Sequence, residues 1–211
     1  SGADRAGVSL YSLHKHLDAV LPVALELLFQ PGFPLTELET TVRNNLQQLE
    51  VEGQKVSTLA RRQFMKSLFG EQHPYGYHTQ PDDLKSLRPD QLSGFHKRHY
   101  TTDNLMVVVA GWQPDRALEA LNRALVQLQP CFANKIVREH AVQTAASGKQ
   151  VVAKEGALQH ALRVGSLMVG KRHPDYPGLK VLNTVLGGYF GSRLMSNLRE
   201  DKGYTYGVGS A

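Results

Sequence analysis

The amino-acid sequence predicts an α+β fold, a two-layer sandwich in which helices cover one face of a mixed, mostly antiparallel sheet. Two patterns lead to this prediction. Long segments carry apolar residues at spacings of three and four, which is typical of helices with one buried face. Short runs that alternate apolar and polar residues, or are apolar throughout, predict strands. These strands are expected at residues 8–13, 105–110, 150–154, 160–169 and 204–209.

Helices are predicted at about residues 18–29, 36–70, 89–99 and 114–128. Asp18 is the expected N-cap of the first helix. Thr36 and Glu39 fit a capping box at the start of the second segment, because a Thr hydroxyl and a Glu three residues later can bond each other's backbone amides. Gly53 is expected to divide that segment or kink it, and Gly70 to end it.

A further helix is predicted from Tyr176 to about Arg199, followed by the strand at residues 204–209. Because the sequence stops inside that strand, we expect a truncated module whose open edge needs a neighbour. Gly187 and Gly188 follow a helical stripe and lack the G-K-[ST] ending of a phosphate-binding loop. They therefore predict close backbone packing rather than nucleotide binding.

Composition excludes several classes of protein. The chain has 211 residues, of which 41% are hydrophobic and 20% charged, so neither disorder nor membrane insertion is expected. The single Cys131 excludes an internal disulfide framework. Residues 1–129 carry a net charge of −1 and residues 130–211 a net charge of +6, but the basic residues are scattered. We therefore expect no nucleic-acid partner.

Nine histidines make a metal site the first chemistry to test. His14 and His16 have no third ligand nearby in sequence, and we expect them at a strand-to-helix junction. The pair His96 and His99 is expected at a solvated helix end. Glu139-His140 resembles the end of an H-x-x-E-H zinc motif, but Ile136 stands at its first position. The sequence therefore predicts neither catalytic nor metal-ligating residues in this chain.

Arg199 and Tyr206 are the candidate substrate-binding residues. The first ends a predicted helix and the second lies on the strand after it, so both side chains can reach one opening. An arginine fork and a phenol are suited to a peptide carbonyl or a developing oxyanion. The alternative is that Arg199 pairs with Glu200 or Asp201 and that Tyr206 packs against its neighbours.

The run from Ser192 to Tyr206, SRLMSNLREDKGYTY, closely resembles the second-domain signature of the pitrilysin and mitochondrial-processing-peptidase family of zinc peptidases. Upstream, Glu37-Leu38-Glu39, Leu68-Phe69-Gly70, His73-Pro74-Tyr75-Gly76, His99-Tyr100 and residues 104–111 follow the later part of the family's first domain. The resemblance implies three parts. Residues 1–129 form the C-terminal half of a first module, 130–149 a linker, and 150–211 the N-terminal half of a truncated second module.

The zinc ligands of this family are not matched here. Its H-x-x-E-H helix would lie before Ser1, and its third ligand, a glutamate, aligns with Gln47 or Gln48, with Glu50 and Glu52 close by. Glutamine carries no charge to neutralise the cation and is a poor zinc ligand. The resemblance therefore implies no cofactor in this chain, with zinc only in an active partner or in an upstream region.

The function implied by the resemblance is that of a non-catalytic domain, inactive by itself, in a zinc-metallopeptidase assembly. Arg199 and Tyr206 would bind the peptide substrate of a catalytic zinc-peptidase subunit, or of the rest of the parent chain. A dimer is expected, and bacterial relatives favour the periplasm. Two alternatives remain open. One is a purely structural subunit, and the other is a fragment of an active peptidase whose parent gene encodes H-x-x-E-H before Ser1.

Overall fold

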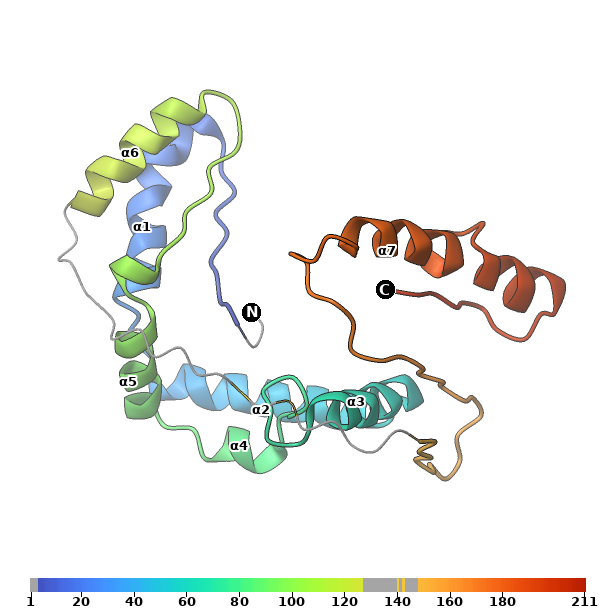
Figure 1. Ribbon diagram of the computed structural model, residues 1–211. Helices are drawn as coiled ribbons and strands as arrows, with labels where there is room; N and C mark the ends of the chain where they lie inside the picture. Colours follow the sequence, from blue (N-terminus) through green and yellow to red (C-terminus); the bar gives the residue numbers. More distant parts are fainter. Residues whose placement is uncertain (1–3, 127–139, 141, 143–147) are drawn as a thin grey trace. The chain divides into compact units, whose positions relative to one another are not determined.

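The computed structural model describes residues 4–126, 140, 142 and 148–211 (Figure 1). The chain separates into two compact units, unit 1 at Ser1–Val164 and unit 2 at Gly165–Ala211. The described helices of unit 1 are η1 (His14–His16), α1 (Leu17–Phe29), α2 (Leu35–Gly53), α3 (Val56–Phe69), α4 (Pro81–Lys85), α5 (Pro89–His99), η2 (Thr102–Asn104) and α6 (Pro114–Val126). Those of unit 2 are α7 (Tyr176–Asn183) and the π-helical turns η3 (Thr184–Gly188) and η4 (Met195–Asp201).

Helices α1 and α6 pack side by side in unit 1 (Figure 1). Leu25 of α1 and Ala120 and Leu121 of α6 are the buried apolar residues of this pair. His14 closes one end of the pair, because its ring meets Trp112 edge-on with the centroids 5.1 Å apart. The apolar stripes of the two helices thus build the small core of unit 1.

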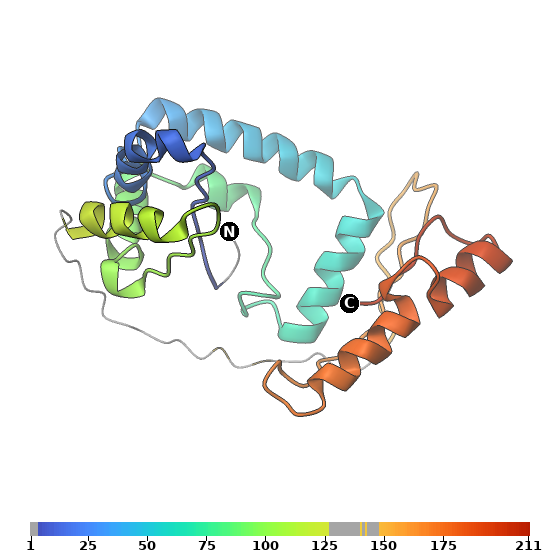
Figure 2. The same cartoon turned by 90° about the horizontal axis from the view of Figure 1, so that it is seen from above.

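Helices α2 and α3 follow one another with a bend between them (Figure 2). The bend lies after Gly53, as the sequence predicts. Helix α3 ends before Gly70, which has a φ of 86°, a backbone conformation that residues with a side chain rarely adopt. The short helix α4 packs against α2. Residues 148–164 have no regular structure. They contact the rest of unit 1 through Gln150, which accepts from Ser67 Oγ over 3.0 Å, and Lys154, whose Nζ donates to Gln54 Oε1 over 2.7 Å.

The predicted helix starts are only partly right. The N-cap of α1 is His16 rather than Asp18, and Pro34 rather than Thr36 precedes α2 without a side-chain capping bond. Side chains accept hydrogen bonds from the N-cap backbone amides at α4 and α5 instead. Asp83 accepts from the Gln80 amide over 2.6 Å, and Gln91 from the Arg88 amide over 2.9 Å. In both cases a proline follows the N-cap, where its missing amide hydrogen costs nothing.

The predicted α+β sandwich is wrong for this structure. Residues 4–126 and 148–211 contain helices, turns and unpaired chain, and no strand is formed among them. The run at residues 105–110 is apolar throughout, which is typical of a buried strand, yet Met106 is 87% and Val108 83% exposed. Alternation and β-branched residues favour an extended backbone, but a strand also needs a hydrogen-bonded neighbour. None of the five expected strands finds such a neighbour in the described chain.

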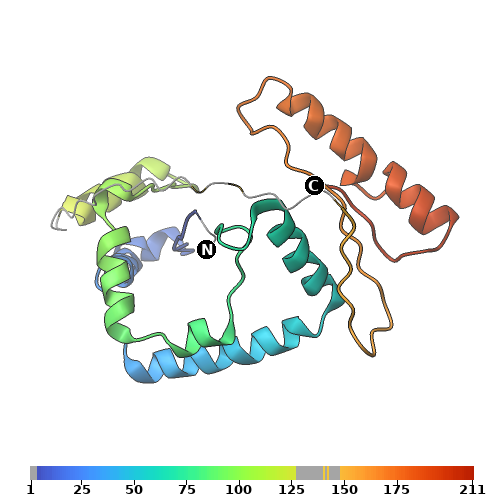
Figure 3. The same cartoon turned by 60° about the horizontal axis from the view of Figure 1, so that its bottom comes forward.

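The long helix predicted in unit 2 is also interrupted. Helix α7 passes into η3, and the chain then leaves the helix at Tyr189, which has the extended dihedral angles φ −149° and ψ 171°. Three glycines at positions 187, 188 and 191 surround this break, so that helix propensity is low there. The chain resumes a helical course into η4, and residues 202–211 run back along the helices (Figure 3).

The expected linker at residues 130–149 falls largely outside the described residues, as does Glu139. The predicted module boundary therefore stays a prediction, and the boundary between the two compact units lies after Val164. Among the described helices, none has both the length and the apolar character that crossing a membrane requires.

Candidate functional site

Arg199 lies in the last turn of η4 and is half-buried. Its guanidinium carbon stands 4.7 Å from the centroid of the Phe190 ring. Such cation–π contacts fix the plane of the guanidinium and leave the N–H groups at its edge available. Glu200 and Asp201 follow directly, but the ion pairs of the described chain include none between Arg199 and either carboxylate. The pairing that the sequence left open is not formed here.

Tyr206 lies beyond a tight turn that follows η4. Gly203 adopts φ 62°, the left-handed region that favours glycine. The Gly203 amide donates to the Arg199 carbonyl over 3.2 Å, and the Tyr204 amide to the Leu198 carbonyl over 2.9 Å. These bonds close the end of the helix and turn the chain. The Tyr206 side chain is then 91% exposed, and its hydroxyl has no bond within the described part of the chain.

The segment carrying Tyr206 is fastened again at Ser210. The Ser210 amide donates to the Gly187 carbonyl over 3.1 Å, and its hydroxyl donates to the Asn183 carbonyl over 2.9 Å. Asn183 Nδ2 donates in turn to the Ser210 carbonyl over 3.2 Å. A Cβ atom on Gly187 would come within 2.6 Å of the Ser210 nitrogen. The prediction that Gly187 packs closely against backbone is confirmed.

The structure therefore places Arg199 and Tyr206 in one unit, on either side of the Gly203 turn. Within the described residues, no hydrogen bond or ring contact joins their side chains directly. Sequence reasoning missed Phe190 as the support of Arg199. The signal for this role was an aromatic residue among three glycines. It was missed because the segment was interpreted as part of one continuous helix.

The histidines of unit 1 mostly serve packing. His96 is half-buried, with its Nε2 atom 2.7 Å from the Leu28 carbonyl of α1 and its ring stacked on Tyr100. It is therefore not part of a solvated helix end, whereas His99 is exposed beside Phe95. In the described ranges, no three His, Cys, Asp or Glu side chains gather as a metal site would require.

Gln47 and Gln48 lie exposed on α2, the helix that the resemblance assigns to the third zinc ligand. Their neutral amides do not suit zinc. Glu52, close by, accepts from Lys55 Nζ over 2.5 Å and from Thr58 Oγ1 over 3.0 Å. These bonds lower the pKa of Glu52, the one from Lys55 most strongly, and they hold its carboxylate away from any ligand role. The two glutamines at the expected ligand position therefore do not fit a zinc ion.

A cavity of about 550 Å³ lies in unit 1, between α2, α3 and the turn that leads into α4. Its lining residues are Leu46, Gln47, Leu49, Glu50, Arg62, Thr79, Gln80, Pro81 and Lys85. Sequence analysis did not single out this cavity, because three separate segments contribute to it. The one available signal was the Arg61-Arg62 pair within an otherwise apolar helical stripe.

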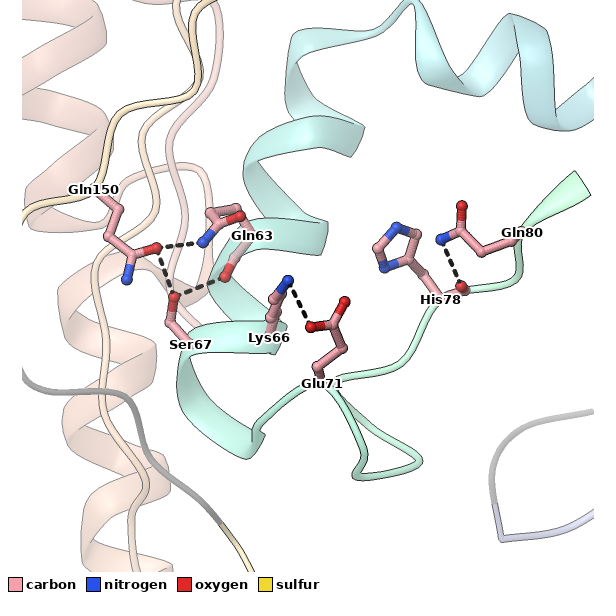
Figure 4. Close-up of polar contacts among 7 residues, drawn as sticks. All are labelled: Gln63, Lys66, Ser67, Glu71, His78, Gln80 and Gln150. Carbon is pink, nitrogen blue, oxygen red and sulfur yellow. Dashed lines mark hydrogen bonds and ion pairs between the residues drawn. The ribbon is translucent and has the colours of Figure 1, made fainter.

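Several polar groups of α3 have side-chain partners (Figure 4). Lys66 pairs with Glu71 over 2.9 Å, and Ser67 donates to Gln150 Oε1 over 3.0 Å. His78 lies in the turn facing α3, and Gln80 Nε2 donates to its carbonyl over 3.1 Å. Burial lowers the pKa of His78, and the positive charges of Arg62 and Lys66 lower it further against the opposing effect of Glu71.

Comparison with known proteins places these features in a family context. A family profile described as the peptidase M16 inactive domain matches residues 86–211. A crystal structure of a peptidase M16 inactive domain from Pseudomonas fluorescens superposes with a TM-score of 0.63 and 24% identity. The superposition covers 93% of this chain and 48% of the crystallised chain. At this level of identity, the match shows a similarity of fold.

Three curated relatives are similar in sequence. An uncharacterised zinc protease of Mycobacterium leprae is 30% identical over 158 residues, which is 70% of this chain and 34% of the relative. The Non-peptidase homolog YmxG of Helicobacter pylori is 26% identical over 95% of this chain and 46% of its own length. The probable inactive metalloprotease YmfF of Bacillus subtilis is 23% identical over 90% and 46%. The chain thus spans between a third and a half of these relatives.

Proposed function

Because the chain belongs to the peptidase M16 inactive-domain family, we propose that it is a non-catalytic part of a zinc-peptidase assembly and helps to hold the peptide substrate. The family predicted from the sequence is confirmed by the match over residues 86–211. In the proposed assembly, zinc belongs to a partner subunit or to another part of the parent protein. Arg199 and Tyr206 of this chain contact the peptide.

The observation that supports this proposal most is the state of the two side chains. Arg199 is held in place by Phe190 without an ion pair in the described chain, so its N–H groups remain available. Tyr206 is 91% exposed, and its hydroxyl makes no hydrogen bond to any residue that the structure describes. A purely structural role would call for an arginine paired with its acidic neighbours and for a packed tyrosine.

The chemistry of the two groups matches a peptide backbone. Arginine offers several charged donors in a fixed plane, and the phenol offers a single directed donor. Both can bond a peptide carbonyl, and both can stabilise the negative charge that develops on its oxygen during hydrolysis. The zinc chemistry itself remains with the catalytic partner.

The surface of unit 2 supports an assembly. Val181 and Leu182 of α7 are exposed, although both are large and apolar, and Phe190 is exposed beneath Arg199. Large apolar side chains left exposed on one unit are a feature of surfaces that make protein–protein contacts. We therefore propose that this face meets the catalytic subunit, in the dimer expected from the sequence.

The test is peptide cleavage by the assembly reconstituted with its catalytic partner. We expect Arg199→Ala and Tyr206→Phe each to lower kcat about 100- to 1000-fold if the donors act on the developing oxyanion, the loss found for single oxyanion-hole donors. If they only position substrate, KM rises and kcat stays nearly constant. Melting temperatures check that both variants remain folded.

The chain offers matched controls in the same unit. Arg193 and Tyr204 are exposed residues of the same types, so Arg193→Ala and Tyr204→Phe should leave cleavage unchanged. Unchanged kinetics for Arg199→Ala and Tyr206→Phe would contradict the proposal and favour a structural subunit. Cleavage by this chain's parent protein without a partner would instead favour the active-peptidase alternative.

A further inference from the structure

The cavity of unit 1 carries two charges of opposite sign that do not neutralise each other. Arg62 of α3 and Glu50 of α2 both line it. Neither belongs to an ion pair or a side-chain hydrogen bond in the described ranges. Opposite charges that share a cavity without meeting leave a space between them for a ligand that carries both charges.

The neighbouring charges are already partnered. Lys66, one helical turn after Arg62, pairs with Glu71 over 2.9 Å (Figure 4). Lys85, which also lines the cavity, lies 3.8 Å from Asp82. His78 contributes no charge near neutral pH, because burial and the nearby cations lower its pKa. The free charges of the lining are therefore one guanidinium and one carboxylate.

The rest of the lining suits a small peptide. Leu46, Leu49 and Pro81 supply apolar surface, and Gln47, Thr79 and Gln80 supply hydrogen-bonding groups. The volume of about 550 Å³ falls in the range of cavities that hold ligands the size of a di- or tripeptide. The lining thus combines three apolar residues with polar and charged groups, which suits the polar backbone and charged ends of a short peptide.

We propose that this cavity binds the two termini of a short, unblocked peptide, with the C-terminal carboxylate on Arg62 and the α-ammonium group on Glu50. Arg62 is half-buried and Glu50 is exposed, so the carboxylate end contributes more to affinity than the amine end. This site is separate from Arg199 and Tyr206 and does not depend on the function proposed for them. It would take peptides of the size that complete proteolysis produces.

The test is calorimetric titration of the 211-residue chain with the dipeptide Ala-Leu in three forms: unblocked, N-acetylated and C-amidated. Amidation should weaken binding about tenfold or more, as expected for a charge-assisted bond to a half-buried group. Acetylation should weaken it about two- to fivefold, as for an exposed ion pair. Arg62→Gln should remove the effect of amidation, and Glu50→Gln the effect of acetylation.

Matched controls separate this pattern from general charge effects. Arg61→Gln changes the adjacent exposed arginine, and Glu39→Gln an exposed glutamate on α2, and neither residue lines the cavity. Both variants should bind all three peptides as the unchanged chain does. Equal affinity for all three forms, loss of binding in Arg61→Gln, or inorganic phosphate binding as tightly as the free dipeptide would each overturn the proposal. Circular dichroism verifies the fold of every variant.

Discussion

The turn at residues 70–83 of unit 1 and the segment at residues 187–210 of unit 2 are held by a similar device and present their tyrosines differently. In each, a glycine is pressed against backbone: Gly76 against Gly70, and Gly187 against Ser210. In unit 1, the Tyr77 hydroxyl donates to Asp83 over 2.5 Å, and Tyr75 packs against Phe69. In unit 2, Tyr204 and Tyr206 are free of such contacts in the described chain.

The pKa values of unit 1 express this difference. The bond to Asp83 raises the pKa of Tyr77, and the same bond, with that from the Gln80 amide, lowers the pKa of Asp83. A tyrosine committed to a carboxylate stabilises its own turn and has no donor left for a ligand. The comparison teaches that residue type alone does not identify a binding tyrosine, because a hydroxyl already bonded to a carboxylate is not available to a ligand.

The largest effect is expected where a glycine has least room. A Cβ atom at position 76 would stand 1.9 Å from the Gly70 carbonyl oxygen, which is backbone and cannot rotate away. We expect Gly76→Ala to lower the free energy of unfolding by about 3 kcal/mol, the upper range for overpacking. Gly187→Ala, 2.6 Å from the Ser210 nitrogen, should cost about 1–3 kcal/mol. Urea unfolding measures both.

Gly178→Ala is the control for both substitutions. It lies in α7 with open space around it, so a methyl group there should stabilise the chain by about 0.5–1 kcal/mol. If Gly76→Ala or Gly187→Ala proved as harmless as this control, the two segments would not be fastened as described.

A smaller effect is expected at the turn before Tyr206. Gly203 has φ 62° but open space around it, so the cost of Gly203→Ala is conformational rather than steric. We expect a loss of about 1 kcal/mol in the free energy of unfolding. In the reconstituted assembly, the same variant should also reduce cleavage, because it shifts the segment that carries Tyr206. If a destabilised Gly203→Ala chain supported normal cleavage, the conformation of this turn would have no role in substrate binding.

The smallest effect concerns acid stability of the turn in unit 1. Because the pKa of Asp83 is lower in the folded chain than in the unfolded chain, its stabilisation is complete above the ordinary value of ~4. It is lost as the pH falls through the lowered value. Asp83→Asn should therefore flatten the fall of the melting temperature below pH ~4, and Tyr77→Phe should do so partly. An unchanged acid profile for Asp83→Asn would contradict this assignment.

The helices of unit 1 could be predicted because their signals are local. Gly53 and Gly70 end α2 and α3 as expected, and the apolar spacing marks α1 and α6. The strands could not be predicted reliably. An apolar run such as residues 105–110 favours an extended backbone, but it does not determine which other segment would pair with it through hydrogen bonds. The interruption at Tyr189 was missed for a related reason: the leucine stripe continues across it while three glycines weaken the helix locally.

The candidate sites also divide into features with a local sequence signal and features that depend on segments distant in sequence. Arg199 and Tyr206 could be predicted from a sequence signature, but Phe190 beneath the guanidinium follows from the helix break, which sequence periodicity hid. The cavity around Arg62 depends on α2, α3 and the turn into α4 meeting in space. A free arginine is recognised only once its neighbours are known to be paired with other groups.

The double attachment of the 203–210 segment has a thermodynamic consequence for ligand binding. Its start is bonded to η4 through Gly203 and Tyr204, and its far end to Asn183 and Gly187 through Ser210. Tyr206 therefore lies in a short closed loop, which samples far fewer backbone conformations than an open tail. Immobilising a residue costs about 1–2 kcal/mol of backbone entropy, and here much of that loss accompanies folding. A ligand that captures Tyr206 then has chiefly the rotation of one phenol ring to restrain.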